Sequence, residues 1–321
     1  MKTRTILISS ISLAALFFVA PAVSAKKRGG GESEEHRHKG LEFFDAKQFD
    51  KAVEEFGKAI DAAPDNPEAY KDRGTAYRAA GRAAIAAGDG PAAGQRLGAS
   101  YADFSKMIEL SPNNAVGYLE RAQTEFAQLN HEGVVNDVNK ALELKGDEAV
   151  AYKYRGFAYI GLKQWDKAVA DFTVALQKDP NDTQNYDQRA LAYRNLNNFD
   201  AAIADYTSAI EKNPNYEPEY ARRGYTYALM EQYEKAIENY QQALKLNPND
   251  QETQERMKYA QGRIAAKNAP PATPTPTPGS GFFTPAKIFF AVVLLIIIAV
   301  VVRLVTRGKP DEPPSTSTRI R

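Results

Sequence analysis

The chain has 321 residues, with 41 Lys and Arg against 40 Asp and Glu, and it contains no Cys. A net charge of +1 gives no electrostatic footprint for DNA or RNA, so a nucleic-acid partner is not expected. The absence of Cys excludes disulfides, thiol nucleophiles and Cys-ligated zinc. A composition of 43% hydrophobic and 25% charged residues is typical of a folded protein.

Residues 1–25 have the pattern of a secretory signal peptide. A short basic start is followed by the apolar run 6–20, and the small residues Val23 and Ala25 precede a polar stretch. Signal peptidase would cut after Ala25, which leaves residues 26–31 as the mature N-terminus. The alternative is an uncleaved N-terminal anchor.

Residues 33–250 repeat with one period, which an insertion interrupts once. The clearest copies begin at Ala149, Thr183 and Glu217, so the period is 34 residues. Small, aromatic and proline residues recur in register, and chance matching at so many positions is negligible. The aligned sets are Tyr152, Tyr186 and Tyr220; Gly156, Ala190 and Gly224; Tyr159, Tyr193 and Tyr227; Ala168, Ala202 and Ala236; Phe172, Tyr206 and Tyr240; Ala175, Ala209 and Ala243; and Pro180, Pro214 and Pro248.

Three further copies lie upstream of these. The copy at 33–66 matches well, and the copy at 115–148 is the weakest because Glu125 replaces an aromatic residue and Gly146 replaces the proline. The copy at 67–114 carries an insertion near residues 81–98, where an Ala-rich stretch surrounds a Gly-Asp-Gly turn. Two extra turns on each helix, giving an inserted helical hairpin, are one interpretation of the insertion. A flexible loop is the other.

The residues after the last copy predict a cap, a linker and a membrane anchor. Residues 251–267 are expected to form a solubilising cap helix, and 268–281, rich in Pro and Thr, an extended stalk. The uncharged core of 283–305 predicts a single transmembrane helix. The basic tail 306–321 would then be cytoplasmic, which agrees with export of the N-terminal part.

The repeat resembles the tetratricopeptide repeat, whose marks are the same aromatic, Gly-x2-Tyr, Ala-x3-Phe, Ala and Pro positions at the same period. The resemblance implies an all-α fold, a right-handed α-solenoid of about six helix-turn-helix units. These units are 33–66, 67–114, 115–148, 149–182, 183–216 and 217–250, and the cap helix extends the solenoid to residue 267.

The resemblance also implies a concave groove, lined by the first helix of each unit, for a protein or peptide partner. Aromatic and aliphatic groove residues would favour an apolar segment anchored by a few charges. Packing between units is the alternative role for Phe126, Phe157 and Tyr225. The groove positions are Lys71, Arg78, Leu119, Gln123, Phe126, Lys153, Phe157, Ile160, Asp187, Arg194, Asn195 and Tyr225.

Neither catalysis nor the family's carboxylate clamp is expected. The clamp needs Asn at the sixth and ninth positions of particular units, and this chain has no Asn at either position of any unit. No catalytic or metal-binding motif occurs, so no cofactor and no metal are predicted. The sequence favours an adaptor that recruits a partner protein on the exported side, most simply in a bacterial periplasm, with a eukaryotic type I membrane protein as the alternative host. A structural tether or self-assembling scaffold is the alternative function, and the oligomeric state stays open.

Overall fold

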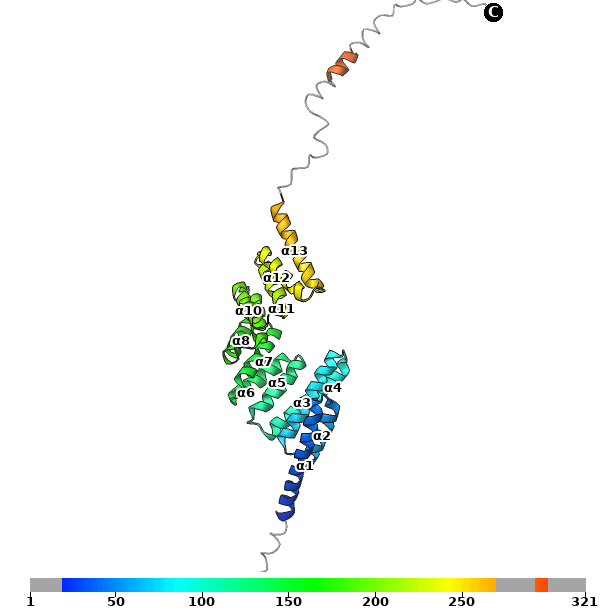
Figure 1. Ribbon diagram of the computed structural model, residues 1–321, viewed down its shortest axis with the longest axis vertical. Helices are drawn as coiled ribbons and strands as arrows, with labels where there is room; N and C mark the ends of the chain where they lie inside the picture. The colour runs from blue at the N-terminus through cyan, green and yellow to red at the C-terminus, as the bar shows by residue number, and fades with distance from the viewer. Residues whose placement is uncertain (1–18, 270–291, 300–321) are drawn as a thin grey trace, which may run out of the picture. The chain divides into compact units, whose positions relative to one another are not determined.

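The computed structural model describes residues 19–269 and 292–299, and the secondary structure within these ranges is helical, with no strand (Figure 1). Thirteen helices follow one another between residues 19 and 268. They are α1 Val19–Asp45, α2 Phe49–Ala62, α3 Pro67–Ala86, α4 Gly90–Leu110, α5 Ala115–Ala127, α6 His131–Glu143, α7 Glu148–Gly161, α8 Trp165–Lys178, α9 Thr183–Asn195, α10 Phe199–Lys212, α11 Glu217–Leu229, α12 Tyr233–Leu246 and α13 Gln251–Asn268.

The first twelve helices form six helical hairpins that stack in chain order. Each odd-numbered helix packs against the even-numbered helix that follows it, and each even-numbered helix from α2 to α10 packs against the next odd-numbered one. From α1 to α9, neighbouring odd-numbered helices also contact one another. We call the surface that they share the odd-helix face. The prediction of an all-helical solenoid is confirmed.

The turn inside each hairpin uses one residue in the left-handed region. Most of these residues are not glycine, so the turns carry a small conformational cost that the packed helices offset. The longest hairpin instead uses Gly88, with φ of 75°. The other turn residues are Lys47, Leu129, Lys163, Asn197 and Glu231, with φ between 57° and 60°.

The insertion near 81–98 is helical in the structure, as the first of the two interpretations proposes. It lengthens α3 to 20 residues and α4 to 21, whereas α5 to α12 have 13 or 14. Asp89 caps α4, since its side chain accepts a hydrogen bond from Ala92 N at 3.0 Å. Leu97 is buried against Gly81, where an added Cβ would come within 2.9 Å of the leucine side chain. The hairpin is therefore packed along its length.

Small residues let the two helices of each hairpin approach closely. In the hairpin α7/α8, a Cβ added at Gly156 would lie 2.9 Å from the ring of Phe172, which is completely buried. Ala168 and Ala175 are equally buried on the same helix as Phe172. Larger side chains at these positions would push the helices apart, at about 1–3 kcal/mol.

Five arginines, which we call the arginine ladder, tie the hairpins together. In α7/α8, Arg155 donates two hydrogen bonds of 2.7 and 2.8 Å to Asp171 and a third of 2.6 Å to Asn139 of α6. Its guanidinium also lies 5.1 Å from the ring centre of Tyr152. One side chain thus joins three helices. The ladder pairs are Arg73–Asp103, Arg121–Asp137, Arg155–Asp171, Arg189–Asp205 and Arg223–Asn239.

The two ends of the chain fall partly outside the described residues. Of the predicted signal peptide, 1–18 lie outside the description, and 19–25 belong to the continuous helix α1. The predicted linker after residue 269 and the tail 306–321 also lie outside it. Of the predicted transmembrane segment 283–305, the structure describes residues 292–299, which are helical. Within the described ranges, no helix has the length and apolarity needed to cross a membrane.

Candidate binding site on the odd-helix face

All twelve predicted groove residues lie on odd-numbered helices, from α3 to α11. Several of them already have partners inside the protein. Leu119 is buried in the core of the hairpin α5/α6, and Ile160 packs against the neighbouring core cluster. Gln123 accepts a hydrogen bond of 3.3 Å from the hydroxyl of Tyr154. Their binding role stays a prediction, but the structure shows which side chains are open to a ligand.

Phe126 and Phe157 form an aromatic contact between the units of α5 and α7. Their ring centres are 5.4 Å apart, and Phe157 also lies 5.4 Å from Phe172 in a T-shaped arrangement. Only 9% of Phe157 is exposed. This geometry is that of packing between units, the alternative that the sequence left open for these rings.

The predicted charged residues are mostly used in ion pairs. Arg78 donates a hydrogen bond of 2.8 Å to the carbonyl of Glu120 and one of 2.5 Å to its carboxylate. These bonds join α3 to α5. Lys153 donates 2.7 Å to Asp182, just before α9, and Lys71 pairs with Glu68 within α3. The Arg78 and Lys153 pairs hold neighbouring units in register, so these two residues are poor candidates for ligand contacts.

Tyr225 is half-buried on α11 and lies between two guanidinium groups. Arg194 of α9 is 5.2 Å from its ring centre, and Arg256 of α13 is 4.6 Å from it. Asn195 is exposed nearby in sequence and donates 2.8 Å to the carbonyl of Leu191. The accessible part of the predicted groove is therefore carried by α9 and α11, and α13 borders it through Arg256.

Two cavities flank α11 on the odd-helix face. The first, which we call the polar pocket, lies between α9 and α11 and has a volume of about 390 Å³. Arg222 donates 2.7 Å to Asp187 and 3.3 Å to Glu219, while Gln188 donates 2.9 Å to Asp187. The pocket is lined by Thr183, Gln184, Asp187, Gln188, Asn213, Tyr216, Glu219 and Arg222.

The electrostatics of the polar pocket are unusual for this protein. Both carboxylates are buried, with 8% of the Asp187 side chain and 4% of the Glu219 side chain exposed. Burial, followed by the negative charge of Asp187, raises the pKa of Glu219 to about 8, and the opposing effect of Arg222 is smaller. A side-chain hydrogen bond with Asp187 adds to this rise in pKa, so the pocket favours the protonated, neutral form of Glu219.

The second cavity, which we call the apolar pocket, lies between α11, α12 and α13. Its volume is about 440 Å³. Leu229 and Tyr259 are exposed at its edge, whereas Tyr240 is buried. Glu255 and Arg256 supply its charged residues. The pocket is lined by Tyr225, Ala228, Leu229, Tyr240, Glu255, Arg256 and Tyr259.

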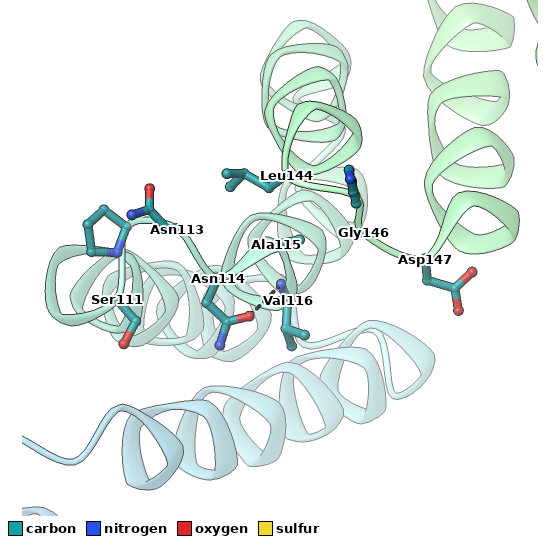
Figure 2. A pocket seen from close by; sticks show the side chains of 10 residues that line it. Ser111, Asn113, Asn114, Ala115, Val116, Leu144, Gly146 and Asp147 are labelled. Atoms are coloured by element: carbon teal, nitrogen blue, oxygen red, sulfur yellow. Dashed lines mark hydrogen bonds between the residues drawn. The ribbon is translucent and has the colours of Figure 1, made fainter.

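A larger cavity of about 720 Å³ lies at the turns that flank α5 and α7, away from the predicted groove residues (Figure 2). Two of its polar side chains, Asn114 and Asp147, are occupied because they cap the helices α5 and α7. Asn114 accepts 3.0 Å from Val116 N, as Figure 2 shows, and Asp147 accepts 3.0 Å from Ala149 N. No cluster able to hold a metal ion occurs among the described residues.

Comparison with known protein families identifies the repeat. Models described as tetratricopeptide repeat match residues 149–182, 188–216 and 218–250, and one described as TPR repeat matches 40–81. The matched segments of the chain are therefore tetratricopeptide (TPR) repeats. No curated protein matches this chain significantly in sequence.

Solved structures share the fold at low sequence identity. The Pseudomonas aeruginosa pilF structure matches with a TM-score of 0.58 at 12% identity, over 74% of this chain and 99% of its own. YrrB, a TPR protein with an unusual peptide-binding site, matches with a TM-score of 0.52 at 20% identity, over 63% of this chain and 97% of its own. A chain of the APC/C hetero-tetramer Cut9-Hcn1 matches with a TM-score of 0.55 at 14% identity, over 77% of this chain and 46% of its own. These similarities concern the TPR fold alone.

Several residues of the two pockets are absent from the predicted groove, above all Glu219. A signal for Glu219 was present in the repeats themselves. It is the third residue of its TPR unit, where the second, third and fourth units have Ala69, Gly117 and Ala151. All three of these are buried. The first unit has the exposed Glu35 there and the fifth has the buried Asn185, so among the six units only the sixth buries a carboxylate at this position. This indicates a site whose chemistry differs from that of the other units.

Proposed function

We propose that this protein is an adaptor that binds a segment of a partner protein on the odd-helix face, across α9, α11 and α13. TPR proteins as a family are protein–protein interaction scaffolds and are generally not enzymes. The observation that carries the proposal is the apolar pocket, which opens where the stack of hairpins ends and exposes 41% of Leu229 and 58% of Tyr259. The peptide-binding site named for YrrB supports the same class of function by analogy.

The bound segment is expected to place an apolar side chain in the apolar pocket. Tyr225 and Tyr240 supply the aromatic walls, and Arg256 and Glu255 can bond to the backbone or polar groups of the segment. The other odd-numbered helices act as the frame, because their aromatic and charged side chains already join neighbouring units.

A peptide-display selection on the full chain in detergent tests this proposal. Enriched peptides should lose about tenfold or more in affinity for Leu229→Glu, because the new carboxylate must be buried with the ligand. Leu246→Glu is the matched control, since Leu246 is 42% exposed but does not line the pocket. Equal binding by both variants, or no enrichment at all, would contradict the adaptor and favour the structural tether.

We further propose that the solenoid is held on the exported side of a membrane by residues 283–305, with the tail 306–321 in the cytoplasm. The signal-peptide pattern and the basic residues after the apolar run support this placement. A chain truncated before residue 283 should leave the membrane fraction of its host, whereas the full chain should resist extraction by carbonate. Protection of the solenoid from protease added to the exported side would contradict the orientation.

A further inference from the structure

The polar pocket contains more negative than positive charge. Asp187 of α9 and Glu219 of α11 are its two carboxylic acids, and Arg222 of α11 is its single cation. Arg194, the other cation near Tyr206, stacks on Tyr225 instead. If both acids ionise, one negative charge in the pocket is left without a counter-charge.

A second TPR interface shows what a balanced arrangement looks like. Between α1 and α3, Arg37 donates 2.7 Å to Asp72. These residues occupy the same two repeat positions as Asp187 and Arg222, with the charges exchanged. The position equivalent to Glu219 is Ala69, which is completely buried. Arg37 also pairs with Glu34, but the Glu34 side chain is 62% exposed, so the second acid of that interface lies in water. Glu219 is thus an additional acid that is buried, with 4% of its side chain exposed.

A buried hydroxyl lies beside the same pocket without a partner. Tyr206 of α10 is completely buried, and within the described part of the chain its hydroxyl makes no hydrogen bond. Burial raises the pKa of Tyr206 to about 12, and the charges of Arg194, Asp187, Arg222 and Glu219 also act on it. The charges of the pocket act on this hydroxyl, although Tyr206 is not among the residues that line the pocket. A ligand can therefore donate a hydrogen bond to the hydroxyl only after it displaces a lining side chain.

We propose that the polar pocket receives a cationic side chain, an Arg or Lys of the bound segment, between Asp187 and Glu219. The inference rests on the proposed function, because it assigns the chemistry of the segment that the odd-helix face binds. A cavity of about 390 Å³ leaves room for the ligand's head group beside Arg222. The side chain of Arg222 is 38% exposed, so it can turn toward solvent as the ligand enters.

The proton on Glu219 takes the place of the missing cation in the free protein. When the ligand's guanidinium or ammonium enters, Glu219 releases that proton to solvent and forms the ion pair. Binding therefore strengthens as pH rises through the pKa of about 8 of the free carboxyl. Arginine itself stays charged throughout this range.

Short peptides of Gly and Ser, each with one Phe and one Arg at varied separation, test the inference on the full chain in detergent. The same peptides with citrulline, the neutral isostere of Arg, form the second set. The best Arg peptide should bind at least about tenfold more tightly at pH 9 than its citrulline partner. Its affinity should rise about tenfold between pH 7 and pH 9, and the citrulline peptide should show no such rise.

Two variants locate the effect. Glu219→Ala, which copies the α1/α3 interface, should bind both peptides equally and remove the pH dependence. Glu238→Ala, an exposed position on α12, should behave as the unchanged chain. Equal affinity for Arg and citrulline peptides in the unchanged chain would overturn the cation site and leave the adaptor standing. An Arg preference that survives Glu219→Ala would also overturn it, and failure of every peptide would reject both proposals.

Discussion

The arginine ladder and the polar pocket are both built from Arg paired with buried acidic side chains, but they differ in charge balance. In the ladder, each of four arginines meets one buried Asp and forms two hydrogen bonds with it. In the polar pocket, Arg222 meets two buried acids and gives each of them a single hydrogen bond. The ladder is complete in the free protein, whereas the pocket retains a proton that a ligand could displace. Charge balance, more than burial, separates the structural pairs from the candidate site.

Glu219→Gln is expected to have the largest effect, because it removes the unbalanced charge. The pKa of about 8 in the folded protein lies above the usual glutamate pKa of 4.5 in the unfolded chain, so unfolding releases a proton. The stability of the unchanged protein therefore falls as pH rises from about 4.5 to 8. The variant should be more stable by roughly 3 kcal/mol at pH 7 and roughly 4–5 kcal/mol at pH 9, with no gain near pH 4. Urea unfolding across this range measures it, and a gain that does not depend on pH would contradict the explanation.

Arg155→Met should have the opposite sign, since it breaks a balanced ladder pair. It leaves the carboxylate of Asp171, of which 7% is exposed, without its counter-ion, and the expected loss is about 4 kcal/mol. Arg223→Met is the matched control, because its ladder partner is the neutral Asn239, and it should lose only about 1 kcal/mol. Denaturant midpoints of the two variants give the comparison. Equal losses would mean that the ladder acts through packing alone.

The sequence predicted the helical solenoid because its marks are local and periodic. Pro180 and Gly156 have their structural effect within a single hairpin, α7/α8. One copy of the repeat is therefore enough to predict what they do. The pockets depend instead on pairs such as Asp187 and Arg222, which come from different units. Their meaning appears only when two helices are placed side by side.

The same reasoning explains which predicted groove residues are occupied. Phe157 and Arg78 stand at groove positions of the repeat, yet the neighbouring unit supplies a ring for one and a carboxylate for the other. Asp187 and Tyr225, by contrast, line the two pockets. Repeat position predicts the helix on which a residue lies, but the adjacent unit decides whether its side chain is accessible.

Glu125 provides a second test of charge balance, because it is also buried with too few partners. Asn130 donates 3.1 Å to one of its oxygens, while the other has no partner in the described part of the chain. Burial, followed by the charge of Asp137, raises its pKa to about 7. Glu125→Gln should therefore stabilise the protein by roughly 3 kcal/mol above pH 7 and have no effect near pH 4. The exposed Glu132→Gln is the control, and a gain at both pH values would point to packing rather than charge.

Tyr206→Phe should have the smallest effect on stability. It distinguishes a role of the hydroxyl in ligand binding from a role in stabilising the fold. The corresponding residue of the preceding unit is Phe172, which is equally buried, so the repeat accommodates a ring without a hydroxyl. Because the hydroxyl of Tyr206 has no partner within the described residues, its removal should raise the free energy of unfolding by up to about 1 kcal/mol. The affinity for the Arg peptide should instead fall roughly fivefold, since one hydrogen bond to the ligand is lost. Thermal unfolding and peptide titration of the same sample measure both quantities. A variant that loses stability but keeps its affinity would show that the hydroxyl serves the fold and not the ligand.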